Sequence, residues 1–270
     1  MLLSRAVSRQ RWWHPAASSS SAVRSAVSSL QSTSPSTSPT TSTTRTLLTA
    51  VTEPPLDSTV TERPCTIILT QDAGVYDDSW SHDFTHQLST QHGMAVAELT
   101  LSSTNTTNPN TTMAEALQEL SADLTRNTHN TVLVARGPWM AWLAQFYLES
   151  LPLAGLVLVD PLPLDDRNSF NQLDMLYRKR NLTETTNYKL YQEYAQHWDH
   201  WTLQLEAGSV PMLVLQSIDR PSFKKGAAIT AKRHSDADSK AGEVVVQRLD
   251  PKKQPNVPQI VSDWINLRVL

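Results

Sequence analysis

Short apolar runs alternate with amphipathic stretches along this chain from Cys65 onward. Runs rich in β-branched residues indicate buried strands, and apolar residues recurring every three or four positions indicate helices. The strand-like runs cover 65–70, 94–101, 132–135, 155–159, 210–216 and 243–249. Helix-like patterns follow most of them. Strands and helices in alternation are typical of a mostly parallel sheet covered by helices, so we expect an α/β fold.

The most informative stretch runs from Thr131 to Leu164. A fully apolar strand reaches a tight turn at Arg136-Gly137 and enters a helix that begins with Pro138. Proline suits the first helical position because an N–H there would have no helical partner. The helix should be buried, because its apolar residues point in nearly every direction: Trp139, Met140, Trp142, Leu143, Phe146, Tyr147 and Leu148.

The N-terminal segment has a different composition. Its first 45 residues hold five arginines and many serines and threonines, and the first acidic residue is Glu53. An arginine-rich, serine-rich segment without acids is typical of an organellar transit peptide. We therefore expect residues 1–50 to be a disordered mitochondrial presequence and 51–64 a linker. A plastid address and a disordered tail without an address are the alternatives.

Charge and cysteine content narrow the function classes. Cleavage of the presequence near Arg45 would remove its five arginines and change the formal net charge from −3 to −8. An acidic mature protein would repel the phosphates of nucleic acid, which argues against nucleic acid as a partner. No apolar run reaches the roughly 18 residues that span a bilayer, so we expect no transmembrane segment. The single cysteine, Cys65, excludes an internal disulfide and is expected to be a buried thiol.

The remaining residues, 65–270, fit one domain. Polar, aromatic-studded helical patterns predict a small helical cap over about 165–208, and a polar insertion is expected over about 224–242. In the last helix, Ile260, Trp264 and Leu267 are predicted to share one buried face.

The order and spacing of these elements resemble the α/β-hydrolase fold. In that family the nucleophile lies in a Gly-x-Ser-x-Gly turn between a strand and a buried helix. The matching residues here are Ala135-Arg136-Gly137-Pro138-Trp139. The resemblance implies that Gly137 stands at the nucleophile position, where it has no side chain to attack a substrate.

Four further departures separate this chain from the family pattern. Pro138 has no N–H to donate to an oxyanion, and Trp139 replaces a small residue of the family turn. The other oxyanion donor, usually beside a His-Gly pair, is replaced by Gln71-Asp72, whose carboxylate would repel an oxyanion. No histidine occurs in 250–255, where the family's base is expected.

Two aspartates, two histidines and an arginine are further candidates for chemistry. Asp219 follows the penultimate strand at the position of the family's acid, and Asp160 is a second candidate. His82 and His86 have a spacing that can hold a metal, but no third ligand is evident and no metal is expected. Arg136 could hold an anion at the helix N-terminus or form a surface ion pair.

The leading hypothesis is a catalytically inactive α/β-hydrolase-like protein that acts as a binding or scaffold component in mitochondria, without a cofactor. A protein partner is expected at the aromatic cap, and Asp72 and Trp139 are expected to line a pocket or interface with it. The expected cap residues are Tyr188, Tyr191, Tyr194, Trp198 and Trp201. One alternative is a serine hydrolase, or a lyase, with a displaced nucleophile such as Ser217 or Ser79. The other is a sensor of a small apolar molecule.

Overall fold

A seven-stranded, mostly parallel sheet forms the centre of the computed structural model. The structure describes residues 48–56, 59–72, 74–76, 78–100, 130–164, 167–196, 203–205, 207–217, 224–235, 244–249 and 256–270. The chain divides into two compact units, 1–44 and 45–270, and all described residues belong to the second.

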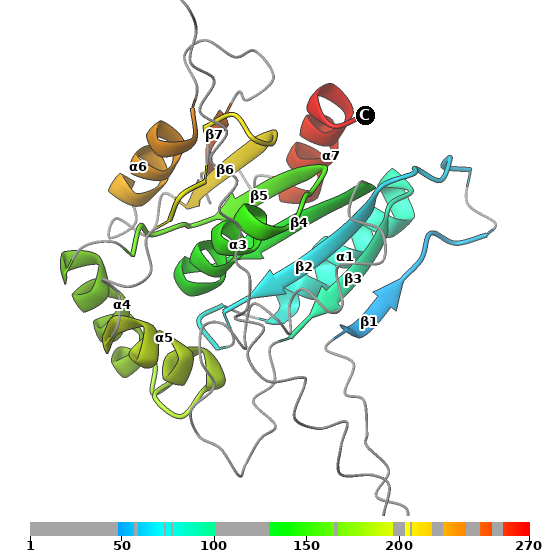
Figure 1. Cartoon of the computed structure of the whole chain (residues 1–270). Helices are drawn as coiled ribbons and strands as arrows, with labels where there is room; N and C mark the ends of the chain where they lie inside the picture. The colour runs from blue at the N-terminus through cyan, green and yellow to red at the C-terminus, as the bar shows by residue number, and fades with distance from the viewer. Residues whose placement is uncertain are drawn as a thin grey trace, which may run out of the picture. The chain divides into compact units, whose positions relative to one another are not determined.

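The strands are β1 (Leu48–Thr52), β2 (Thr66–Gln71), β3 (Ala95–Leu99), β4 (Thr131–Arg136), β5 (Gly155–Val159), β6 (Met212–Ser217) and β7 (Val244–Leu249). Their order across the sheet is β1-β3-β2-β4-β5-β6-β7, and only β1 runs antiparallel to its neighbour. The parallel strands point their carboxyl ends toward one edge, beside α4 and α5 (Figure 1).

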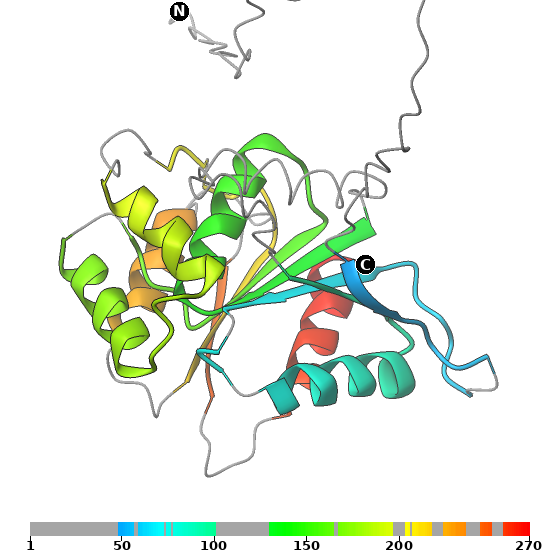
Figure 2. The ribbon, with the colours of Figure 1, turned by 90° about the horizontal axis from the view of Figure 1, so that it is seen from below.

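Helices cover both faces of the sheet. They are α1 (Asp78–His92), α3 (Pro138–Ser150), α4 (Arg167–Lys179), α5 (Thr186–Gln196), α6 (Lys224–His234) and α7 (Val257–Arg268). Helices α1 and α7 pack on one face, and α3 and α6 pack on the other, with α4 and α5 beyond α3 (Figure 2). The described residues therefore form the α/β architecture expected from the sequence.

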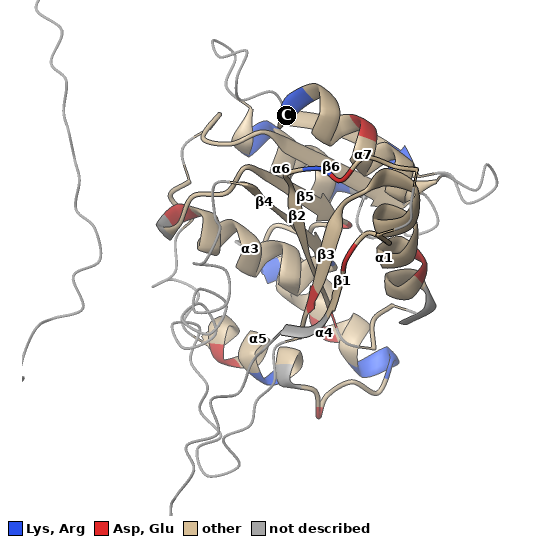
Figure 3. Cartoon of the chain, turned by 90° about the vertical axis from the view of Figure 1, so that its right-hand side faces the viewer, with Lys and Arg blue, Asp and Glu red and all other residues tan. Residues whose placement is uncertain are grey.

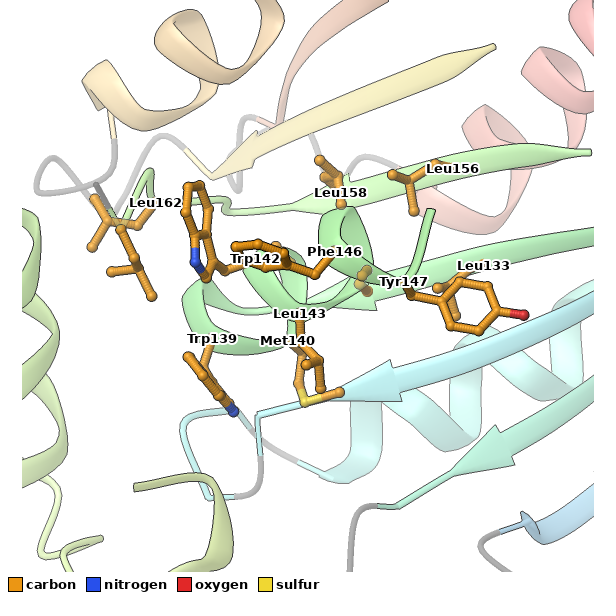
Figure 4. Packing of buried hydrophobic residues seen from close by; sticks show 14 of the residues in the cluster. Leu133, Trp139, Met140, Trp142, Leu143, Phe146, Tyr147, Leu156, Leu158 and Leu162 are labelled. Carbon is orange, nitrogen blue, oxygen red and sulfur yellow. The ribbon is translucent and has the colours of Figure 1, made fainter. Parts of the chain in front are cut away.

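Apolar side chains fill both interfaces of the sheet. Figure 3 shows the central strands and α3 almost without charged residues, whereas charges lie on the outer helices. Helix α3 is buried on all sides, and its large side chains leave it in several directions (Figure 4). Among the described residues, no helix is both long and apolar enough to cross a membrane.

Three parts of the fold differ from the sequence expectation. Strand β1 occupies the border between the expected presequence and linker, where it pairs with β3 as an edge strand. The first half of the expected polar insertion is a helix, α6, because four of its residues form a narrow buried face. These are Ala227, Thr230, Ala231 and His234.

The third difference is in the last helix. Leu267 is 79% exposed, so its predicted place on the buried face is wrong. The buried face of α7 is centred on Val257, Val261 and Ile265, and Leu267 lies about 120° away from it around the helix at 3.6 residues per turn.

The predicted helix over 112–124 lies outside the described residues.

Candidate functional site

The turn between β4 and α3 has a backbone conformation that glycine adopts and other residues avoid. Gly137 has φ 108° and ψ 160°, a region that is essentially restricted to glycine. Its N–H donates to the carbonyl of Val159 in β5 at 2.9 Å, and its carbonyl accepts from Ala141 N–H at 2.8 Å. The turn is thus fixed to the neighbouring strand on one side and to the first turn of α3 on the other.

Asp72 caps the N-terminus of α3 from another strand. It follows β2, and its N–H donates to the carbonyl of Arg136 at 2.9 Å. Its carboxyl oxygens accept from the N–H groups of Trp139 at 3.0 Å and Met140 at 3.1 Å. A carboxylate is stabilising here because these N–H groups have no partner within the helix and the helix dipole is positive at this end.

The same carboxyl group fills the space above Gly137. A Cβ added to Gly137 would lie 2.4 Å from Asp72 Oδ2 and 2.8 Å from its Cβ and Cγ. These distances are shorter than real contacts of a Cβ atom. Glycine at 137 is therefore required both by the backbone conformation and by the carboxyl group beside it.

The cap reaches Asp72 through α4 and α5. Asn187 in α5 donates from Nδ2 to Asp72 Oδ1 at 3.3 Å, and Tyr177 in α4 also contributes a polar interaction. Complete burial raises the pKa of Asp72 to about 7, although the hydrogen bonds from Trp139, Met140 and Asn187 and the nearby hydroxyl of Tyr177 oppose that change.

Asp160, the second acid candidate, is also buried at this edge of the sheet. It accepts from Ser217 N–H at 2.7 Å, from Ser217 Oγ at 2.9 Å and from the hydroxyl of Tyr76 at 3.3 Å. With φ 53° it has the left-handed conformation that Asp tolerates better than most residues. Its carboxyl group therefore joins the ends of β5 and β6 and the segment after β2.

Arg136 stacks on aromatic side chains at the end of β4. Its guanidinium carbon lies 4.0 Å from the ring centre of Tyr76 and 3.9 Å from that of Trp80, so the group is stacked between two aromatic rings. The carboxyl group of Asp72 occupies the N-terminus of α3, which is the position expected for an anion held by Arg136.

The aromatic residues of the cap point into the molecule. Tyr188, Tyr191 and Tyr194 are buried, and the last two contact Trp139 with ring centres 6.3 and 5.7 Å apart. The prediction that these three tyrosines form an exposed partner surface is wrong, because Tyr191 and Tyr194 pack against α3 and Tyr188 packs against α4. Asp219, Trp198 and Trp201 lie outside the described residues.

The remaining candidate groups whose side chains are described form no hydrogen bond with Asp72 or Asp160. His82 and His86 are exposed on α1, with ring centres 6.3 Å apart. Within the described ranges, no three His, Cys, Asp or Glu side chains converge as a metal site would require. Cys65 is buried as predicted, and burial raises the pKa of its thiol to about 11. For Ser79, the structure describes only its backbone position in α1.

Sequence reasoning missed the cap residues that meet Asp72. Asn187 is a buried polar residue within an aromatic helix, and its low helix propensity was the available signal. It also missed a buried pair between α6 and α3, in which His234 Nε2 and Gln145 Oε1 are 2.7 Å apart. No pattern in the sequence brings these two positions together.

Comparison with known proteins gives information on the fold. No family model and no curated protein sequence matches the chain. Among solved structures, the chain is similar to MenH from S. aureus, with 9% identity and a TM-score of 0.52, over 81% of this chain and 98% of that one.

Two thioesterases are similarly related. For the RedJ thioesterase of the prodiginine pathway in Streptomyces coelicolor, the identity is 13% and the TM-score 0.54, over 78% of this chain and 96% of that one. For the type II thioesterase BorB of the borrelidin biosynthetic cluster, the identity is 14% and the TM-score 0.51, over 80% of this chain and 97% of that one. The described chain has the α/β-hydrolase fold.

Proposed function

We propose that this protein does not hydrolyse substrates with the usual machinery of its fold and acts instead as a binding or scaffold component. One observation carries the proposal: the Asp72 carboxyl group is held at the N-terminus of α3, directly against Gly137. In α/β hydrolases the nucleophile stands at this turn, and a backbone N–H at the start of the following helix stabilises the oxyanion.

The contacts of Asp72 leave little scope for acyl transfer. The N–H groups of Trp139 and Met140 already donate to its carboxyl oxygens, and Pro138 has none to offer. An oxyanion would have to displace a carboxyl group that is buried and bonded on several sides. Losing a single oxyanion donor typically costs about 10²–10³ in rate.

A conventional base and acid also have little support. The segment 250–255, which follows β7, contains no histidine in the sequence. The carboxyl group of Asp160 is engaged by Ser217 and Tyr76. An acid without a histidine to orient cannot play its part in a catalytic triad.

An active hydrolase with a displaced nucleophile is the second candidate, since the thioesterases that share the fold are enzymes. Ser217 is its best residue, because it lies at the carboxyl end of β6 and its hydroxyl donates to Asp160 at 2.9 Å. Activation would additionally require a group that removes the serine proton.

Labelling with a fluorophosphonate probe and hydrolysis of a short thioester and a p-nitrophenyl ester separate the two candidates. We expect no label and no turnover above the buffer rate in the folded full-length protein. Ser235→Ala is the control, because Ser235 is exposed. The proposal would be overturned if the wild type and Ser235→Ala were labelled and Ser217→Ala were not.

Mitochondrial location and a protein partner are part of this proposal. Support for the location comes from the composition of residues 1–50. Isolated mitochondria should import a reporter that carries these residues and so protect it from added protease. They should not import the same reporter when its five arginines are replaced by glutamine. Import of both reporters alike, or of neither, would reject the mitochondrial address.

A further inference from the structure

Strand β1 lies within the part of the chain that has the composition of a presequence. This part contains no acidic residue before Glu53, and its last arginine is Arg45. Yet β1, which covers Leu48–Thr52, belongs to the folded sheet because it pairs with β3. Removal of the presequence must therefore stop ahead of β1, or the sheet loses a strand.

The pairing with β3 shows what a later cut would cost. Ala50, Val51 and Thr52 are in register with 98, 97 and 96 of β3, and Leu48 is in register with Leu99. Strand β2 occupies the other side of β3, so β1 covers its remaining edge. A chain cut within or after β1 would leave the backbone N–H and carbonyl groups along that edge without strand partners.

The next arginine along the chain is held within the folded unit. The N–H of Arg63 donates to the carbonyl of Gly93 at 2.8 Å, and a Cβ added to Gly93 would lie 2.3 Å from the carbonyl oxygen of Thr61. These contacts fix 61–63 against the residue that follows α1. Peptidases cut segments that can leave the folded structure, so Arg63 is a poor cleavage signal.

We infer that an endopeptidase that recognises arginine removes the presequence by cutting one of the three peptide bonds between Arg45 and Leu48. Water adds across the bond, so the presequence ends in a new carboxylate and the mature chain begins with a new amino group directly ahead of β1. This inference rests on the proposed mitochondrial address and adds the site of processing to it.

Arg45 supplies the group that the peptidase would recognise. A guanidinium can form two parallel hydrogen bonds with one carboxylate, so an acidic subsite distinguishes Arg45 from its uncharged neighbours Thr44 and Thr46. The larger compact unit of the chain also begins at Arg45. The recognition group thus stands at the boundary of the folded unit, three residues ahead of the strand that has to be kept.

Import of the full-length precursor into isolated mitochondria tests the site. Chemical labelling of new amino groups, followed by mass spectrometry, identifies the first residue of the product that is protected from added protease. We expect this residue to be Thr46, Leu47 or Leu48.

Variants assign the cut to Arg45. Arg45→Gln should still be imported, because four arginines remain, but its cleavage should be at least about tenfold slower, since a charged hydrogen-bonding group is lost. Arg24→Gln is the matched control, because it also loses one arginine of the presequence. Its cleavage should proceed at the wild-type rate.

Three results would overturn the inference and leave the mitochondrial address intact. They are import without cleavage, a mature chain that begins at or before Arg45 or after Leu48, and cleavage of Arg45→Gln as fast as that of Arg24→Gln. A precursor that is not imported at all would reject the address, and the inference with it.

Discussion

At the scale of single residues, Gly137 and Asp72 form one steric unit although 65 positions separate them. The positive φ of Gly137 excludes most side chains, and the Asp72 carboxyl group occupies the place where a Cβ would be. Each residue therefore limits what the other can be. Ordinary pairwise packing in a core is more tolerant, because a flexible side chain can move away.

Substitution of Gly137 should show this coupling. We expect Gly137→Ala to lower the free energy of unfolding by at least about 2 kcal/mol, because strain at such a φ costs about 1–3 kcal/mol before the crowding is added. Asp72→Ala removes the carboxyl group but keeps the Cβ at 2.8 Å, so it relieves part of the crowding. The double variant should therefore lose less stability than the sum of the two single changes. Urea titrations of all four proteins measure this, and strictly additive losses would contradict it.

At the scale of elements, α3 is attached to helices on both sides of it. The cap meets its first turn at Asp72, and α6 meets its middle through the 2.7 Å contact between Gln145 and His234. Gln145 also donates from Nε2 to the carbonyl of Ala141 at 2.8 Å. This orientation leaves Gln145 Oε1 as the acceptor, so His234 carries a proton on Nε2 and donates it to Gln145.

Acid should weaken the attachment of α6. Burial, and then the charge of Arg233, lowers the pKa of His234 from 6.5 to about 4. The folded-state pKa is below that of the unfolded chain, so this contribution is complete above about pH 6.5 and is lost as the pH falls toward 4. The resulting decrease in the free energy of unfolding reaches about 2 kcal/mol at pH 5.

Chemical unfolding of wild type and His234→Gln at pH 5 and pH 7.5 isolates this effect, since glutamine does not titrate. The wild type should lose stability relative to the variant on going to pH 5. A constant difference between the two proteins would show that His234 is protonated equally in the folded and unfolded states.

At the scale of the whole molecule, β1 closes one edge of the sheet. It pairs antiparallel with β3, and without it β3 would present an unpaired row of N–H and carbonyl groups. Open sheet edges of this kind favour association between molecules. The boundary of the folded unit thus lies before Leu48, not within the segment expected to be a linker.

Shortened chains test that boundary. A chain that begins at residue 46 should have the same melting temperature as the full-length protein. A chain that begins at residue 53 lacks β1, so we expect a melting temperature several degrees lower and a greater tendency to aggregate. Equal melting temperatures for the two shortened chains would mean that β1 contributes nothing to stability.

The sequence predicted those parts of the molecule that are specified locally. The apolar runs located β2 to β7, and Gly137-Pro138 located the turn before α3, because buried strands and helix starts leave a signal in neighbouring residues. It did not predict β1, whose pairing with β3 depends on a distant strand. It also placed the cap tyrosines outside, since periodicity indicates an apolar face but not what covers it.

The candidate site could be predicted only in part, for the same reason. Gly137, Asp72 and Asp160 were singled out because they follow strands whose carboxyl ends meet at one edge. Their partners Asn187, Tyr177 and Tyr76 come from separate segments, and no spacing rule links these to the strands. No pattern in the sequence predicts the contact between Asp72 and the N-terminus of α3.

The packing of Asp72 against Gly137 also constrains how this protein can change over generations. A serine at 137 meets the carboxyl group unless position 72 has already been replaced, and replacing Asp72 alone removes the cap of α3. Each single step is therefore disadvantageous, and the pair removes only the contact with the carboxyl group, because a side chain at this φ remains strained. Sequences intermediate between this one and one with a serine nucleophile are therefore expected to be less stable than either. This would preserve the present arrangement even where selection for it is weak.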